Sequence, residues 1–159
     1  MSRILAALAR HAAATPRAIA LEGQEGRLDY AGLRAAVSAL AEQLATIRPR
    51  VVALHAQNGI AWAVADLAAL AAEIPCVPLP TFFSPAQRIH ALATAGVDLL
   101  LSDTPGLVQA PLRCGPARPF YKELWATPLR SRPASLPEGT VKITFTSGTT
   151  GTPKGVCLG

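Results

Sequence analysis

Residues 146–155, TSGTTGTPKG, combine the residue types that can hold a polyphosphate. Glycines let backbone N–H groups come close to anionic oxygens and permit positive φ angles. Serine and threonine hydroxyls can donate hydrogen bonds, and Lys154 adds a positive charge. This composition predicts a phosphate-binding loop in which backbone amides, hydroxyls and one cation share the contacts.

The loop does not match the Walker A pattern, which requires a glycine directly before the lysine and a helix after it. Pro153 stands at that glycine position, and Gly155 follows the lysine. Both residues, with the strand-like run 156–158, argue against a helix here. We therefore expect the loop itself, not a helix N-terminus, to hold the phosphates. The alternative is a surface hairpin, but two to five residues are enough to turn a hairpin.

The segment before the loop, VKITFT at 141–146, alternates strictly between apolar and polar residues. This period of two predicts a strand with one face in the core and one face meeting polar groups. Lys142 lies on the polar face, where it either adds charge to the site or is exposed to solvent. His55 ends another expected strand, at a position where ligands often sit in α/β sheets. A buried or exposed histidine without such a role is the commoner case.

Two helices are expected upstream from the spacing of apolar residues. The stripe in 31–47 has helical periodicity, and Asp29 is a suitable N-cap. A second, almost entirely apolar helix is expected to follow Gly59 and to end near Glu73. The first residues of the chain are interpreted as one more helix, in which the arginines need not belong to a transit peptide.

A further helix begins at a recognisable capping motif. Ser84 can cap it, Pro85 suits its first turn, and Gln87 can close a capping box. Gly96 is a good residue to end it. The expected strands lie at 51–55, 75–80, 97–101 and 141–146. Because 75–80 contains three prolines, it is expected to be an edge strand or a strand only in part.

Strands that alternate with helices predict an α/β fold with a mostly parallel sheet flanked by helices. Residues 104–138 hold seven of the 14 prolines and are expected to be an irregular segment, with a possible helical turn at 121–126. The three cysteines match no zinc or redox spacing, so free thiols in a reducing, cytoplasmic compartment are expected. No apolar run is long enough for a bilayer. Part of the net charge of +5 lies at 113–132, near aromatic residues, but this proline-rich stretch is interpreted as a solvated connection, so nucleic-acid binding is not expected.

The run TSGTTGTPKG resembles the signature loop of the adenylate-forming superfamily, which includes acyl-CoA synthetases, peptide-synthetase adenylation domains and luciferases. Weaker resemblances follow in the family's order at 28–33, 56–80 and 84–103. The resemblance implies that residues 1–159 are the N-terminal portion of an AMP-binding domain, ending at the phosphate loop. It assigns the β- and γ-phosphates of ATP to Thr146, Ser147, Gly148, Thr149, Thr150, Gly151 and Lys154, with Lys154 as the catalytic residue.

The resemblance also implies a reaction. A carboxylic acid would attack the α-phosphate of ATP with Mg²⁺, release pyrophosphate, and then pass to coenzyme A. Alternatives are a peptide-synthetase or acyl-carrier ligase, which uses a carrier pantetheine, and a non-catalytic ATP-binding module. The family's Mg²⁺ ligands lie beyond this loop, so we expect the 159 residues alone to be inactive. Two departures are visible: 48–50 replaces a Gly-Asp turn, and 73–75 replaces a small Ala-Gly-Ala-like turn.

Overall fold

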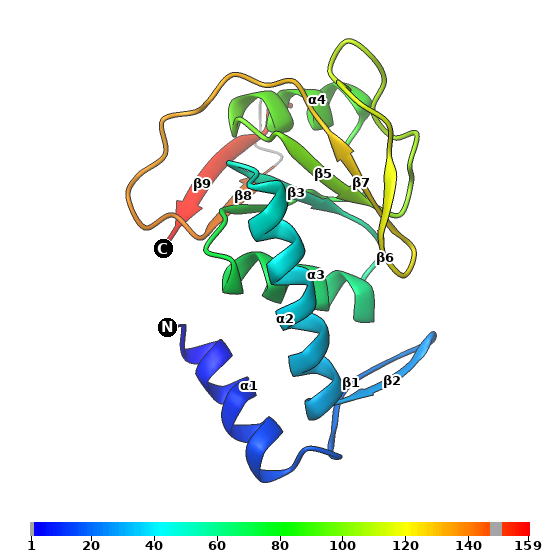
Figure 1. The fold of residues 1–159 in the computed structure, drawn as a ribbon. Helices are drawn as coiled ribbons and strands as arrows, with labels where there is room; N and C mark the ends of the chain where they lie inside the picture. Colours follow the sequence, from blue (N-terminus) through cyan, green and yellow to red (C-terminus); the bar gives the residue numbers. More distant parts are fainter. Residues whose placement is uncertain (1, 147–150) are drawn as a thin grey trace. The chain divides into compact units, whose positions relative to one another are not determined.

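A computed structural model of the chain describes residues 2–146 and 151–159. It divides into two compact units, Met1–Arg48 with Asn58–Glu73, and Pro49–Gln57 with Ile74–Gly159. Figure 1 labels their helices and strands. Within the described residues, no helix is long and apolar enough to cross a membrane.

The first unit is a set of helices with one small hairpin. Its elements are α1 (Arg3–Ala14), β1 (Ile19–Gly23), β2 (Gly26–Asp29), α2 (Tyr30–Ile47) and α3 (Ile60–Ala71). The expected helices are all present. Asp29 caps α2 as predicted, because its Oδ1 accepts a hydrogen bond from the Gly32 N–H at 2.7 Å. The antiparallel β1–β2 hairpin was not predicted, although two glycines bracket its turn.

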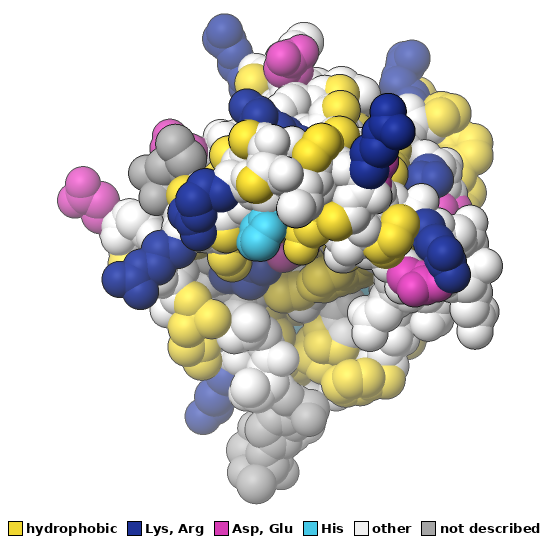
Figure 2. Space-filling view, turned by 90° about the horizontal axis from the view of Figure 1, so that it is seen from below, with side chains coloured by type: hydrophobic (Ala, Val, Ile, Leu, Met, Phe, Trp, Pro, Cys, Tyr) yellow, Lys and Arg dark blue, Asp and Glu magenta, His cyan; other side chains and the backbone are white. Residues whose placement is uncertain are grey.

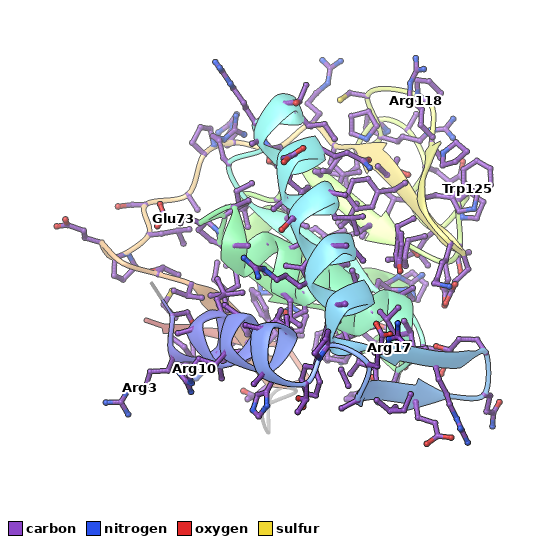
Figure 3. All side chains as sticks on the ribbon, turned by 60° about the horizontal axis from the view of Figure 1, so that its bottom comes forward. Arg3, Arg10, Arg17, Glu73, Arg118 and Trp125 are labelled. Atoms are coloured by element: carbon purple, nitrogen blue, oxygen red, sulfur yellow. The ribbon has the colours of Figure 1, made fainter. Side chains whose placement is uncertain are left out.

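Long-range contacts complete this first unit. The N-cap residue of α3 is Gly59, which has no side chain, and Glu25 from the β1–β2 turn accepts a hydrogen bond from the Ile60 N–H instead. A carboxylate at this position also interacts favourably with the positive end of the helix dipole. On α1, Leu8 is buried, whereas Arg3 and Arg10 are exposed and project away from the helix (Figure 3). This amphipathic arrangement agrees with an ordinary first helix.

The two segments that depart from the family's sequence, 48–50 and 73–75, each begin with a residue in the left-handed backbone conformation. Arg48 caps the C-terminus of α2 with φ 57°, and Glu73 follows α3 with φ 57°. Glycine adopts this region without a steric penalty, whereas other residues adopt it at a cost of about 1 kcal/mol or more. Both helix ends therefore adopt a backbone conformation that glycine favours, with a residue other than glycine.

The second unit holds a seven-stranded sheet in the order β6-β7-β5-β3-β4-β8-β9. Its strands are β3 (Val52–His55), β4 (Cys76–Pro78), β5 (Leu99–Ser102), β6 (Arg118–Tyr121), β7 (Leu124–Pro128), β8 (Lys142–Thr146) and β9 (Lys154–Leu158). The four central strands β5, β3, β4 and β8 are parallel, and antiparallel pairs extend the sheet at both edges. The predicted α/β class with a largely parallel sheet is confirmed.

Helix α4 (Pro85–Thr94) packs against this sheet within the second unit. The predicted capping box is present, with Ser84 and Gln87 exchanging hydrogen bonds, and Gly96 adopts φ 67° after the helix. Ala91 and Leu92 of α4 are fully buried in one cluster with apolar side chains from β3, β4, β5 and β8. The α4 helix is therefore fixed at its start by its cap and along its length by the core.

Strand β4 is not at an edge of the sheet. It lies between β3 and β8, but it covers only three residues, so the expectation of a partial strand is confirmed and that of an edge strand is wrong. N–H groups along a strand alternate between its two neighbours, and the Cys76 N–H donates at 3.0 Å to the carbonyl oxygen of Val141, the residue directly before β8. Pro78 would direct its N–H to the same side but has none, and the β4–β8 ladder is correspondingly limited to Cys76↔Lys142.

The proline-rich residues 104–138 contain two strands. Strands β6 and β7 pair as an antiparallel hairpin, and β7 also pairs with β5. Lys122, at φ 49°, occupies the turn, so the expected helical turn at 121–126 is wrong. Trp125 on β7 and Arg118 on β6 mark this hairpin in Figure 3. The two strands were not predicted from the sequence, because Pro119 lies within β6 and Pro128 ends β7.

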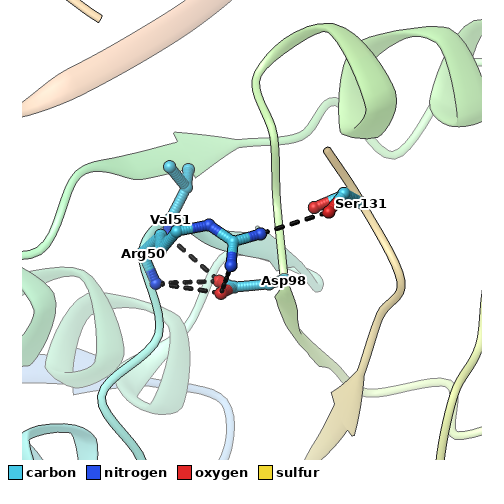
Figure 4. A network of polar contacts seen from close by, with 4 residues as sticks. All are labelled: Arg50, Val51, Asp98 and Ser131. Carbon is cyan, nitrogen blue, oxygen red and sulfur yellow. Dashed lines mark hydrogen bonds and ion pairs between the residues drawn. The ribbon is translucent and has the colours of Figure 1, made fainter. Parts of the chain in front are cut away.

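The amino ends of β3 and β5 are joined by the Asp98 carboxylate (Figure 4). It accepts hydrogen bonds from the Arg50 N–H at 2.9 and 3.1 Å and from the Val51 N–H at 3.2 Å. It also pairs with the Arg50 guanidinium at 3.5 Å, and that guanidinium donates to the Ser131 carbonyl at 3.2 Å. One carboxylate thus satisfies two strand-end amides and one cation.

We predict that Asp98→Ala lowers the free energy of unfolding by about 2 kcal/mol, because the partly buried Val51 N–H and the exposed Arg50 N–H lose a charged acceptor. Urea denaturation measures the change. The control is Glu22→Ala, which removes an exposed ion pair with Arg27 and is expected to cost less than about 0.5 kcal/mol. Equal effects of the two substitutions would show that Asp98 does not stabilise the strand ends.

Candidate phosphate-binding site

The predicted loop leaves the sheet at the carboxyl ends of its parallel strands. In the aligned register of β3 and β5, His55 lies opposite Ser102, and β8 runs in the same direction and ends at Thr146. Ligands of open α/β sheets bind in the crevice beyond these strand ends. The sheet therefore places the loop at the edge where a ligand is expected.

Strands β8 and β9 hold the two described ends of the loop opposite each other. Their antiparallel register pairs Thr146 with Lys154, so the sheet brings together the first and last predicted binding residues. Gly151 has φ 75°, which favours glycine. Lys154 is exposed, and within 2–146 and 151–159 its ammonium group has no hydrogen bond or ion pair. The predicted binding residues Ser147, Gly148, Thr149 and Thr150 lie outside the described residues.

The packing of the β8–β9 hairpin also explains why a glycine stands at position 155. Gly155 lies opposite Phe145, and a Cβ at Gly155 would come within 3.0 Å of the Phe145 ring. Phe145 and Ile143 are buried, as the alternation of β8 predicted. The hairpin interpretation and the phosphate interpretation are compatible, since a connection at 147–153 is longer than a turn needs. In the described residues 151–159, strand β9 and not a helix follows the loop, as expected.

Helix α4 contacts the returning limb of the loop. The His90 Nε2 lies 3.0 Å from the carbonyl oxygen of Pro153, and the Gln87 amide donates to the carbonyl oxygen of Gly151 at 3.4 Å. The sequence marked Gln87 only as a capping residue, and it carried no signal that His90 belongs to the site. Their spacing of three residues puts both on one face of the helix, but which segment that face meets depends on the tertiary fold.

Asp103 ties the ends of β3 and β5 together at this edge. Its two oxygens accept hydrogen bonds from the Gln57 N–H at 3.0 Å and from the Thr104 hydroxyl at 3.1 Å. The Ser102 hydroxyl accepts from the Thr104 N–H at 3.0 Å. The acidic oxygens are therefore engaged within the protein, which lowers their repulsion toward an anionic ligand.

His55 is buried beside this cluster, with 7% of its surface exposed. Neither ring nitrogen has a hydrogen-bond partner among the described residues. Burial, followed by the Arg88 guanidinium, lowers the pKa of His55 below its ordinary value, and Asp103 opposes the shift in part. At neutral pH the ring is therefore uncharged.

The remaining candidates lie away from the loop. Lys142 begins β8 at the end opposite Thr146, about 13 Å along the strand. Cys157 is an exposed free thiol on β9. Outside residues 1 and 147–150, no group of three His, Cys, Asp or Glu side chains is placed to hold a metal ion. On the face drawn in Figure 2, lysine and arginine side chains project separately, with other side chains between them.

Comparison with known proteins identifies the family. The AMP-binding enzyme model matches residues 8–159. The nonribosomal peptide synthetase gliP of Aspergillus fumigatus is 33% identical over 144 residues, covering 87% of this chain and 7% of that protein. The antimetabolite synthetase AmbE of Pseudomonas aeruginosa is 34% identical over 168 residues, covering 98% and 8%. This chain is therefore a member of the AMP-binding enzyme family, as the resemblance indicated.

Solved structures show the same fold. O-succinylbenzoate coenzyme A synthetase (MenE) from Bacillus subtilis, in complex with AMP, is 27% identical with a TM-score of 0.68 over 94% of this chain and 40% of that chain. A structure of MenE with ATP and a magnesium ion gives 25% identity and a TM-score of 0.69, over 94% and 41%. The chain thus spans about two fifths of MenE and less than a tenth of gliP and of AmbE.

We predict that stability falls as the pH drops below about 6.5, because the pKa of His55 is lower in the folded than in the unfolded state. The contribution of the neutral His55 ring to stability is complete well above pH 6.5, where the ring is neutral in both states. The contribution is lost as the pH falls from 6.5 to the folded-state pKa, because the unfolded chain binds the proton first. Urea denaturation between pH 5 and 8 tests this, and His55→Leu should flatten the pH dependence. Parallel curves for both proteins would contradict it.

Proposed function

We propose that this chain forms part of the ATP site of an enzyme that activates a carboxylic acid as its acyl-adenylate. The observation that carries the proposal is the pairing of Thr146 with Lys154 at the carboxyl edge of the parallel sheet. It puts a hydroxyl and an exposed cation at the two ends of a glycine- and threonine-rich loop. Family membership and the MenE structures with AMP and ATP support the same conclusion.

The chemistry requires a leaving group to be stabilised. A carboxylate oxygen forms a bond to the α-phosphorus, the bond from that phosphorus to the bridging oxygen breaks, and pyrophosphate departs with the electron pair. Lys154, with loop amides and hydroxyls, holds the β- and γ-phosphates and offsets the negative charge that grows on them. Mg²⁺ would supply further charge compensation when it is bound with ATP. We assign no Mg²⁺ ligand among the described residues.

The thiol acceptor separates two candidates. Coenzyme A, the acceptor expected from the sequence, is supported by the likeness to a coenzyme A synthetase. The peptide synthetases among the relatives favour a carrier pantetheine, with an amino acid as substrate. Their identity of 33–34% exceeds the 27% to MenE, so we place carrier-linked transfer beside coenzyme A as the second candidate.

The test is acid-dependent exchange of radiolabelled pyrophosphate into ATP by the intact protein, with amino acids, aryl acids and fatty acids as substrates. We expect exchange with one of these classes, and none from the isolated 159 residues. Thioester formation is then assayed with coenzyme A and with a carrier pantetheine. Binding of ATP without exchange for any acid would support a non-catalytic ATP-binding module instead.

We predict that Lys154→Ala slows adenylation by about tenfold to a hundredfold, because one charged group is lost from the leaving pyrophosphate. Thioester formation from a pre-made adenylate is expected to change far less. Lys154→Arg should restore part of the rate. Lys122→Ala is the matched control, since it removes a lysine from the β6–β7 turn at the other edge of the sheet. Equal losses in both half-reactions would refute the role of Lys154.

A further inference from the structure

Two polar side chains of α4 reach the same limb of the candidate loop. His90 contacts the Pro153 carbonyl and Gln87 contacts the Gly151 carbonyl, so alternate peptide carbonyls face the helix. Pro153 is buried, whereas Lys154 beside it is exposed. The limb 151–154 is therefore attached to α4 by its carbonyl groups, which leaves the charged side chain accessible.

The hydrogen-bond partner of His90 determines which nitrogen of its ring carries a proton. A carbonyl oxygen can only accept a hydrogen bond, so the Nε2 of His90 must carry the proton and donate to Pro153. The Thr94 hydroxyl lies farther from the same nitrogen, at 3.5 Å. Gln87 is oriented in a similar way, because its Oε1 accepts from the Ser84 N–H at 2.9 Å and its NH₂ group faces the loop.

These contacts fix the direction of the peptide N–H groups as well. In a planar trans peptide, the carbonyl and the following N–H point in opposite directions. With the carbonyls of Gly151 and Pro153 turned toward α4, the N–H groups of Thr152 and Lys154 are turned away from it. Since α4 is held by its capping box and its buried face, it is a rigid support for this orientation.

We propose that His90, assisted by Gln87, is a positioning residue for the triphosphate of ATP. It holds the limb 151–154 so that the Lys154 side chain and the neighbouring amides face the phosphates. This inference rests on the proposed function for its ligand, but the attachment itself exists without nucleotide. The two can therefore be tested separately in the same protein.

The first measurement concerns the attachment in the 159-residue chain without nucleotide. The backbone order parameter of the Thr152 amide, measured by nitrogen-15 relaxation, is expected to be lower in His90→Ala than in the wild type, because the limb loses one hydrogen bond to α4. His90→Gln, whose amide nitrogen can take the place of Nε2, should restore the wild-type order parameter. Nitrogen NMR of the His90 ring should show the Nε2-protonated form.

The second measurement concerns the ligand. MgATP affinity, measured by calorimetry on the same chain, is expected to fall about threefold to tenfold in His90→Ala and to recover in His90→Gln. Ile89→Ala is the control, because Ile89 is an exposed residue of the same helix without a polar contact to the loop. Urea denaturation confirms that each variant folds.

The outcomes distinguish the two proposals. Loss of affinity in His90→Ala with recovery in His90→Gln supports the positioning role. Wild-type affinity in His90→Ala, or an equal loss in Ile89→Ala, overturns it. If the wild-type chain binds no MgATP, ATP binding by this chain fails. An unchanged Thr152 order parameter in His90→Ala would then also overturn the attachment, whereas a lower one would retain it.

Discussion

The register of the parallel strands is the constraint on which the rest of the second unit depends. Val52 lies opposite Leu99 and His55 opposite Ser102, so β3 and β5 begin and end level with each other. Asp98 secures the beginning by accepting hydrogen bonds from the Arg50 and Val51 amides, and Asp103 joins the ends. A shift by one residue would move every side chain to the other face of the sheet. The loop after β8 meets the same carboxyl edge because β8 runs parallel to these strands.

The elements that local signals specify were predictable from the sequence. Asp29 and the Ser84 capping box marked helix starts that the structure reproduces, and the alternation of β8 gave its buried face. Local sequence signals did not predict the strands whose position depends on pairing within the sheet. Strand β4 is central because its two neighbours accommodate a strand with few donors, and β6–β7 pair despite their prolines. Proline lowers the intrinsic preference for a strand, but it does not forbid one whose missing N–H is not needed.

The candidate site divides in the same way. Lys154, Thr146 and Gly151 were predicted because their chemistry is concentrated in one short segment, and the structure brings the first two together across a ladder. His90 and Gln87 are more than sixty residues from the loop, as the spacing of their contacts shows. Nothing in the helix they belong to marks them as site residues, because a polar face is the usual exposed face of a helix. His55 was noted only as a strand end, and its lowered pKa follows from burial and Arg88.

The absence of a helix directly after the loop explains why such distant contacts matter. In loops that open into a helix, the first turn presents its N–H groups already aligned toward a phosphate. Here β8 leads through the loop into β9, so the ladder aligns the peptides only as far as Thr146 and from Lys154 onward. The peptides at 151–153 need another source of alignment if they are to bind charge without reorganising. A second, rigid element that contacts the Gly151 and Pro153 carbonyl groups provides it, and α4 is the helix that makes these contacts in the part of the chain described.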